Sequence, residues 1–157
     1  MTALKIGQVT QRFFPSIGGV ETHVYELSKR LVGRGHEVTV FTSDIIAEYP
    51  KPERRVEVQR RLKLGIRIKR FRSISMVNSG RSNRTIMPSM VPSLIREKPD
   101  IIHAHSLGYY PTFASAPPKL IGRSKLVITA HSDPTFGSYR PRLACLPLRL
   151  AHRVIAL

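Results

Sequence analysis

The chain has 157 residues, 41% of them hydrophobic, and a formal net charge of +16 at pH 7. This length predicts one domain with its own core and leaves no room for a second of ordinary size. The single Cys145 excludes an internal disulfide, and its apolar neighbours predict a small core residue. No apolar run approaches the ~20 residues that span a bilayer, and no secretory leader is recognisable. We therefore expect a cytoplasmic protein whose membrane contact can only be peripheral.

The positive charge is concentrated in one segment of the chain. Lys51 to Arg72 contains ten Lys or Arg against two glutamates, and no acidic residue follows Asp133. Such a segment attracts an anionic membrane surface, a nucleotide or nucleic acid. The alternative interpretation is a solvated surface whose charge only keeps the protein soluble. A non-catalytic basic nucleic-acid-binding α/β domain stays open as a second function. Against it, Phe71 is the only aromatic residue of the segment, and no helix-turn-helix, RRM or zinc-finger pattern occurs.

The first elements form a βαβ pattern. Lys5 to Thr10 predicts a buried strand. A helix follows, because apolar residues recur at helical spacing on one face: Val20, Val24, Leu27 and Leu31. Gly35 predicts the end of this helix, and the β-branched run Glu37 to Thr42 predicts the second strand.

The middle of the chain predicts shorter elements. We expect a loop over Asp44 to Pro52 and two short strands, Val56 to Val58 and Ile66 to Lys69, the second being the third parallel strand of the sheet. Ser73 to Arg84 is rich in Ser, Asn, Gly and Arg and predicts a mobile surface loop. A helix is expected from about Ser89 to Glu97.

The last third of the chain continues the alternation. Strands are predicted at Ile101 to Ala104, at Leu126 to Thr129 and from Val154 onward, and a helix at Leu143 to Ala151. Between the first two strands we expect a short helix that stops before Pro117-Pro118, because proline breaks a helix interior. The whole pattern predicts an α/β domain with a Rossmann-like, doubly wound, mostly parallel sheet.

Polar residues and glycines follow three of the predicted strands, where ligands of such sheets bind. They are Gly18-Gly19, His105-Ser106 and His131-Ser132. The glycine pair can take φ > 0 and lets a ligand approach the backbone, while the following helix N-terminus favours an anion. A tight turn without a ligand is the alternative interpretation.

The histidines are the candidates for chemistry. At a strand end, histidine can donate to a phosphate or a sugar hydroxyl, act as a general base or bind a metal. His103 and His105 share one face of their strand, so we expect an interior, supporting His103 and a His105 nearer the rim. A zinc site would need third and fourth ligands at suitable spacing, so we expect no metal and no cofactor. His23 is equally compatible with the helix surface and with function.

Several motifs in sequence order carry a family resemblance. They are Phe13-Phe14-Pro15, Gly18-Gly19-Val20-Glu21-Thr22-His23, Arg34-Gly35-His36-Glu37-Val38, Ile102-His103-Ala104-His105 and Ile128-Thr129-Ala130-His131. From about Lys5 to Leu157 the chain resembles the opening of the family-four retaining glycosyltransferases, most closely the branch that glycosylates phosphatidylinositol and similar lipids. The resemblance implies the N-terminal half of a GT-B fold, in which two Rossmann-like domains face a cleft and hold the acceptor and the nucleotide sugar.

The resemblance also implies roles for the strand-end residues. His131 would lie beside the reacting sugar as the catalytic residue, and the amides of Gly18 and Gly19 would approach the donor diphosphate. Glu21 would meet polar acceptor groups, and the substrate-binding set is completed by His105, Ser106 and Ser132.

We expect residues 1–157 to contain only the acceptor-side domain of this two-domain fold. The E-x7-E pair of the family belongs to the donor-binding domain, and no two glutamates here have that spacing. We therefore expect residues 1–157 to require a separate or missing C-terminal domain and to be inactive alone. The sugar, its nucleotide and the lipid or glycan acceptor are left open.

Overall fold

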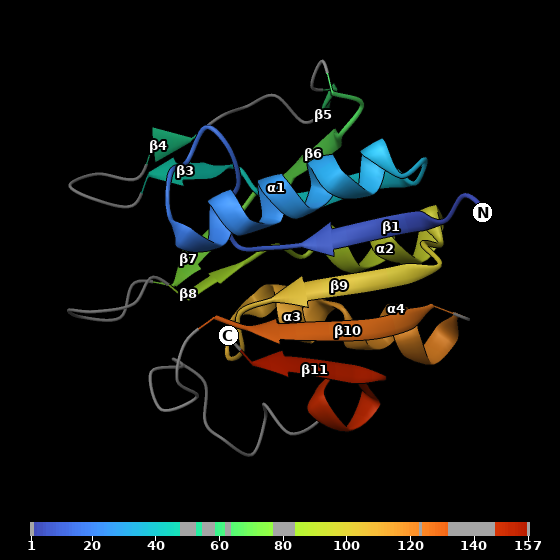
Figure 1. The fold of residues 1–157 in the computed structure, drawn as a ribbon. Coiled ribbons are helices and arrows are strands. Elements are labelled where there is room, and N and C mark those ends of the chain that lie inside the picture. The colour runs from blue at the N-terminus through green and yellow to red at the C-terminus, as the bar shows by residue number, and fades with distance from the viewer. Residues whose placement is uncertain are drawn as a thin grey trace.

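The computed structural model describes residues 2–47, 53–54, 59–61, 64–76, 84–122, 124–131 and 147–156. A seven-stranded sheet forms the centre of the protein (Figure 1). Its strands, in spatial order, are β11 (Arg153–Ala156), β10 (Lys125–Ala130), β9 (Ile101–His105), β1 (Lys5–Val9), β2 (Glu37–Ser43), β6 (Arg67–Phe71) and β5 (Gln59–Arg61). All neighbours pair in parallel except β5 and β6. This is the Rossmann-like, doubly wound order, whose direction of winding changes between β1 and β9.

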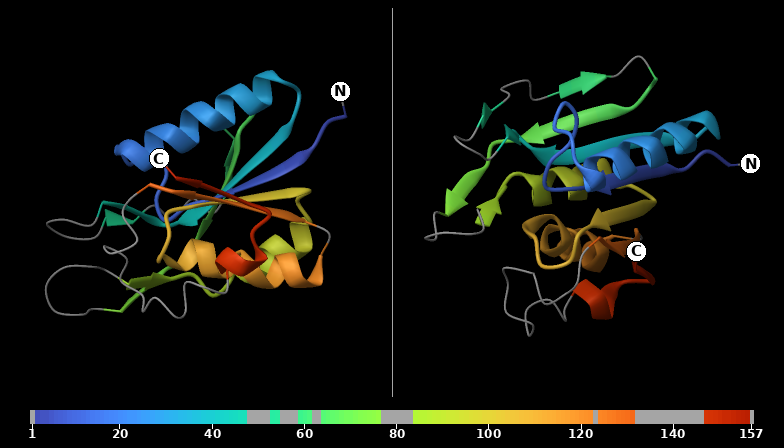
Figure 2. Two further views of the ribbon diagram at one scale, coloured as in Figure 1. Left: turned by 60° about the horizontal axis from the view of Figure 1, so that its bottom comes forward. Right: turned by 60° about the vertical axis from the view of Figure 1, so that its left-hand side comes forward.

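The helices cover the two faces of the sheet unequally. Helix α1 (Gly19–Gly33) lies on one face, and α2 (Met90–Glu97), α3 (Tyr110–Ala114) and α4 (Ala116–Ile121) lie on the other (Figure 2). Residues 147–150 are also helical and pack on this second face through Leu148 and Leu150. The face under α1 is therefore less fully covered by the described elements.

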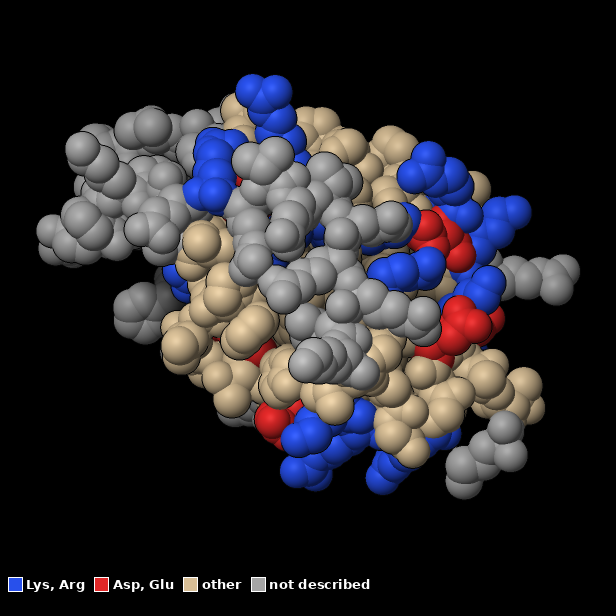
Figure 3. Space-filling model, turned by 90° about the horizontal axis from the view of Figure 1, so that it is seen from above, with Lys and Arg blue, Asp and Glu red and all other residues tan. Residues whose placement is uncertain are grey.

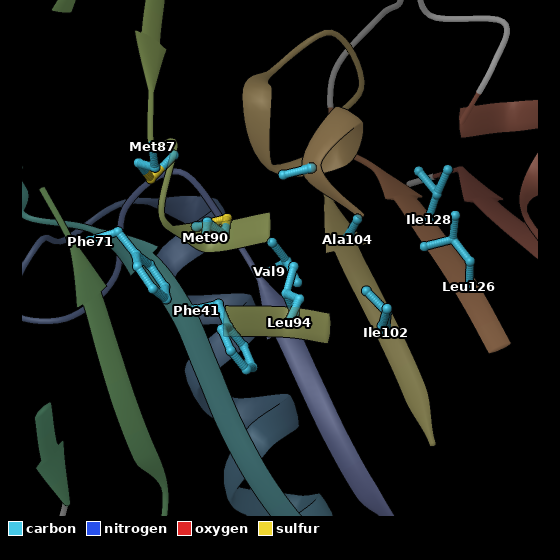
Figure 4. Packing of buried hydrophobic residues seen from close by; sticks show 11 residues of the cluster. Val9, Phe41, Phe71, Met87, Met90, Leu94, Ile102, Ala104, Leu126 and Ile128 are labelled. Carbon is cyan, nitrogen blue, oxygen red and sulfur yellow. The ribbon is translucent and has the colours of Figure 1, made fainter. Parts of the chain in front are cut away.

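Two apolar clusters hold these layers together. Under α1, the buried cluster consists of Phe13, Val24, Val40, Ile66 and Ile68. The larger cluster on the opposite face includes Val9, Phe41, Phe71, Met87, Met90, Leu94, Ile102, Leu126 and Ile128 (Figure 4). Adjacent Val40 and Phe41 belong to different clusters because successive side chains of a strand point to opposite faces. Each large buried side chain contributes about 1.5–3 kcal/mol.

Most of the expected elements are confirmed. The βαβ unit is present, and α1 is followed by Gly35 in the left-handed region at φ 87°. The strands expected at residues 66–69, 101–104 and 126–129 and from residue 154 correspond to β6, β9, β10 and β11, and the expected helix at residues 89–97 corresponds to α2. The expected helix at residues 143–151 is confirmed only for 147–150, since residues 132–146 lie outside the described residues.

Two expected loops contain antiparallel pairs instead. β3 (Ile45–Ala47) pairs with β4 (Glu53–Arg54), and β7 (Ile74–Met76) pairs with β8 (Arg84–Ile86). Asp44 supports this arrangement: its Oδ2 accepts from Arg54 Nη1 at 3.1 Å and its Oδ1 accepts from the Ser73 amide at 3.0 Å. One carboxylate thus connects two segments whose polar composition resembles that of loops. The strand expected at Val56 to Val58 lies outside the described residues.

The short helix expected before the proline pair is confirmed as α3, which ends at Ala114. Pro117 and Pro118 themselves lie in the first turn of a further helix, α4, which the sequence did not predict. Proline is tolerated there because the N–H groups of a first helical turn have no partner within the helix.

β11 leaves apolar surface exposed at one edge of the sheet. Val154 and Ile155 are 50% and 42% exposed. A cavity of about 350 Å³ lies beside this strand on the α1 face, with Leu27, Leu31 and Val127 in its lining. Within the described part of the chain, no helix combines the length and the apolar character needed to cross a bilayer.

Candidate active site at the carboxyl ends of the strands

Three strand ends meet around one cavity. It has a volume of about 300 Å³ and is lined by residues that follow β1, β9 and β10, among them Gly18, Gly19, Glu21, Ser106 and His131. The parallel strands bring these residues together because their carboxyl ends share one edge of the sheet. Five of the seven predicted site residues thus line one cavity. Ser132 lies outside the described residues, and His105 takes a different position.

The space around Gly18 and Gly19, and not an unusual backbone dihedral angle, explains why glycine occupies this turn. Gly18 is the N-cap of α1 with φ −175°, extended backbone that any residue adopts, and neither Gly18 nor Gly19 uses the φ > 0 that glycine permits. A Cβ on Gly18 would instead collide with the carboxylate of Glu21, whereas a Cβ on Gly19 would meet no described atom within 4 Å. Among the residues that the structure describes, no side chain caps the start of α1. Its first N–H groups therefore adjoin the cavity beside an unobstructed Gly19.

Glu21 is held inside the turn. It is 6% exposed, and its Oε1 lies 3.1 Å from Nε of Arg12, another residue of the cavity lining. An acidic residue in the first helical turn is also favoured by the helix dipole. The contact of Glu21 with an acceptor remains a prediction.

His105 is an interior residue, which corrects its expected place at the rim. β9 runs one residue further than predicted, so His105 is still within the strand and is 0% exposed. Its Nε2 lies 2.7 Å from Oε1 of Gln8 on β1, and its Nδ1 lies 3.1 Å from Nε2 of His131. His105 therefore orients the His131 ring from the interior of the sheet through this hydrogen bond.

These contacts determine the protons on both rings. Oε1 of Gln8 can only accept, so Nε2 of His105 carries the proton and Nδ1 has a free lone pair. Nε2 of His131 must then donate to that lone pair. In this neutral arrangement, Nδ1 of His131 is left without a proton.

Burial keeps the interior histidines neutral. Loss of solvation lowers the pKa of His105 to about 2 and the pKa of His103 to about 4, and neighbouring histidines act in the same direction. Partial burial likewise lowers the pKa of His131, aided by His23 and opposed by the Glu21 carboxylate. The predicted interior position of His103 is confirmed, and its Nε2 lies 2.7 Å from Oγ1 of Thr129.

Sequence reasoning missed several residues of this site. Gln8 lies inside the predicted strand from Lys5 to Thr10, where a single polar residue in a buried strand is itself a signal of a specific hydrogen-bond partner. Tyr109 and Arg12 also line the cavity. Ser106 has φ 72°, a left-handed conformation uncommon for residues other than glycine and found preferentially at functional sites.

His23 joins the same group from helix α1. Its ring centroid is 4.9 Å from that of His131 and 5.8 Å from that of His105. One ring nitrogen from each of these three histidines lies within 4.8 Å of the others. The arrangement could hold a metal ion, so the third ligand that the sequence spacing did not indicate comes from α1.

Part of the basic segment is neutralised within the fold. Lys69 and Arg67 both pair with Glu97, with Arg67 Nη2 3.0 Å from Oε2, and the hydrogen bond from Lys69 lowers the pKa of Glu97. Arg54 pairs with Asp44 at 3.1 Å, and Arg70 is buried, donating to the Ser43 carbonyl at 3.2 Å. Figure 3, which views the protein from above relative to Figure 1, shows acidic groups beside some of the Lys and Arg of that face. The segment is therefore less available to an anionic partner than its composition suggests.

Comparison with known proteins gives a consistent family assignment. The family model described as Glycosyltransferase Family 4 matches residues 17–157. One component of the human phosphatidylinositol N-acetylglucosaminyltransferase is 49% identical over 37 residues, 24% of this chain and 8% of that protein. The gpi3 subunit of the same enzyme in Schizosaccharomyces pombe is 50% identical over 34 residues, 22% of this chain and 8% of that protein. The chain matches less than a tenth of the length of these relatives.

One solved structure is also similar. The catalytic domain of starch synthase IV from Arabidopsis thaliana, bound to ADP and acarbose, superposes with a TM-score of 0.47 at 16% identity. The superposition covers 83% of this chain and 34% of that one.

Proposed function

The chain belongs to glycosyltransferase family 4, and from this premise we propose that residues 1–157 form the acceptor-side domain of an enzyme that glycosylates a lipid-linked hydroxyl. The observation that carries the proposal is the cavity where Gly19, Ser106 and His131 meet at three strand ends. The names of the curated relatives favour N-acetylglucosamine as the sugar and phosphatidylinositol as the acceptor.

The start of α1 suits the charge that develops during transfer. Negative charge grows on the departing diphosphate of a nucleotide sugar, and fixed N–H groups that point at such charge stabilise it. Gly19 supports this role because its missing side chain leaves the approach to these N–H groups open. Arg12 adds a positive charge in the same lining.

His131 is proposed to orient a hydroxyl of the reacting groups. Its Nε2 donates to the fully buried His105, so the ring is held in one orientation. Nδ1 then accepts a hydrogen bond from a hydroxyl in the cavity, and neutral imidazole is the form that can do so. The hydrogen bonds that link Gln8, His105 and His131 thus keep the accepting nitrogen of His131 unprotonated.

A donor-side domain is proposed to complete the enzyme. No pair of glutamates in this sequence has the spacing of the E-x7-E motif, and the curated relatives are much longer than the stretches matched here. The exposed Val154 and Ile155 offer apolar surface for contact with a further element. Donor, acceptor and both domains would meet at the cavity.

We also propose a peripheral position on the cytoplasmic side of a membrane, where a phosphatidylinositol acceptor would be presented. The basic edge strand β5 and the exposed Arg72 support this placement. Each basic residue near an anionic surface contributes about 1 kcal/mol.

A transfer assay tests the proposed function. Residues 1–157 are mixed with a separately produced family-four donor-side domain, labelled UDP-N-acetylglucosamine and phosphatidylinositol vesicles. We expect label in lipid only when both polypeptides are present, and a loss of roughly 100-fold or more in His131→Ala. His36→Gln, outside the cavity, is the control and retains transfer. Transfer by residues 1–157 alone, or full transfer by His131→Ala, would overturn the proposal.

A further inference from the structure

Three histidines, of which His131 lines the cavity, have a geometry that sugar transfer does not require. His105 comes from β9, His131 follows β10 and His23 belongs to α1, so three separate elements bring ring nitrogens within 4.8 Å of one another. We propose that His23, His105 and His131 form a binding site for one divalent transition-metal ion of the zinc class. The proposal does not rest on the proposed function.

The spacing of the nitrogens fits a shared ion. Zn–N bonds of about 2.0–2.1 Å place two tetrahedral ligand nitrogens roughly 3.3 Å apart. Nδ1 of His105 and Nε2 of His131 are 3.1 Å apart, close to that separation. A ring nitrogen of His23 lies within 4.8 Å of one ring nitrogen of each of the other two histidines, and this half-buried ring can close the remaining gap by rotation about its side-chain bonds.

Gln8 supplies the outer contact that metal-binding histidines usually have. Its Oε1 accepts from Nε2 of His105 at 2.7 Å, so Nδ1 of this buried ring is free to bind an ion. Such outer partners fix the tautomer and the orientation of the ligand, and their loss typically weakens metal binding by about 10–100-fold.

The donor set determines the class of ion. Neutral imidazoles suit Zn²⁺, Co²⁺, Ni²⁺ and Cu²⁺, whereas Mg²⁺ and Ca²⁺ prefer oxygen ligands. Three protein ligands leave one tetrahedral position for water. When the ion binds, the proton on Nε2 of His131 moves to Nδ1 by exchange with solvent, and the hydrogen bond between His105 and His131 is replaced by two bonds to the metal.

Direct metal titration tests the proposal without any sugar. Residues 1–157 are prepared without an affinity tag, in a Cys145→Ser background so that the thiol cannot contribute. We expect one Zn²⁺ per chain by equilibrium dialysis and Co²⁺ absorption bands typical of a low-symmetry, tetrahedral site. Mg²⁺ should not compete.

Variants assign the ligands. His23→Ala and His131→Ala should lose the bound ion, whereas His36→Gln should keep it; circular dichroism verifies that each variant is folded. Gln8→Leu should bind about 10–100-fold more weakly, and Gln8→Glu should restore binding. Absence of stoichiometric Zn²⁺ binding, or binding unchanged in His23→Ala and His131→Ala, would overturn the proposal. A bound ion would leave Nδ1 of His131 protonated and unable to accept from a hydroxyl, so the transfer assay is run with a chelator and Zn²⁺ is expected to inhibit it. Failure of metal binding therefore does not decide the transfer assay, and the two proposals fail separately.

Discussion

Oε1 of Gln8 lies 2.7 Å from Nε2 of His105, although the two residues are 97 positions apart in the sequence. The contact joins β1 to β9, where the direction of winding changes. The other amide group of Gln8, Nε2, is buried and has no hydrogen-bond partner among the described residues. Such an orphaned donor costs about 1–3 kcal/mol. Gln8 is therefore better explained by the orientation of His105 than by stability.

The interior histidines predict a pH dependence of stability. The pKa values of His103 and His105 fall from 6.5 to about 4 and about 2 on folding. Below pH 6.5 the unfolded chain binds more protons than the folded one, so stability is full above this value and falls as the pH drops toward 4. Between about pH 6.5 and pH 5, each of these histidines lowers the free energy of unfolding by up to about 2 kcal/mol.

Urea unfolding near pH 7 and near pH 5 measures this loss. The variant His103→Leu removes one of the two buried groups, so its stability should fall less steeply with acidification. His36→Gln should behave like the unmodified chain. Equal unfolding free energies at both pH values would contradict the inference that His103 and His105 stay neutral in the folded protein.

A pair of alanine substitutions tests the open space at Gly19. Within the described part of the chain, a Cβ meets nothing within 4 Å at either Gly19 or Gly33, at the two ends of α1. Both substitutions should preserve the fold and raise helix stability by up to about 1 kcal/mol, measured by thermal unfolding. Gly19→Ala alone adds a methyl group to the cavity at the proposed place of the donor diphosphate, and it should weaken transfer in the two-domain assay roughly tenfold or more. Equal transfer by both variants would show that the diphosphate does not approach α1.

Charge reversal tests the proposed membrane contact. Arg60→Glu with Arg61→Glu alters the edge strand β5, whereas Lys29→Glu with Arg30→Glu makes the same charge change on exposed positions of α1. We expect sedimentation with phosphatidylinositol or phosphatidylserine vesicles to fall in the β5 variant and at high salt, because the attraction is electrostatic. An equal loss of vesicle sedimentation in both variants would indicate that binding depends on the net charge of the protein and not on β5. Tighter binding to single-stranded RNA would favour nucleic acid as the partner.

The sequence predicted the sheet well because its central strands are short, largely buried segments rich in Ile and Val that alternate with helical patterns. It did not predict the antiparallel pairs at β3–β4 and β7–β8, since these depend on Asp44 reaching Arg54 and Ser73. Likewise, the strand ends indicated the cavity, but the roles of Gln8 and His23 depend on contacts between distant elements. Periodicity reports which face is buried and carries no information about such partners.

Ligand preference tests the central claim most directly. Chemical-shift changes of labelled residues 1–157 are measured with a short-chain phosphatidylinositol and, separately, with UDP-N-acetylglucosamine. An acceptor-side domain should bind the lipid headgroup, with changes at Glu21 and Ser106 that are lost in His131→Ala, and it should respond weakly to the nucleotide sugar alone. Saturable binding of the nucleotide sugar without any response to the lipid would contradict the assignment of this domain to the acceptor side.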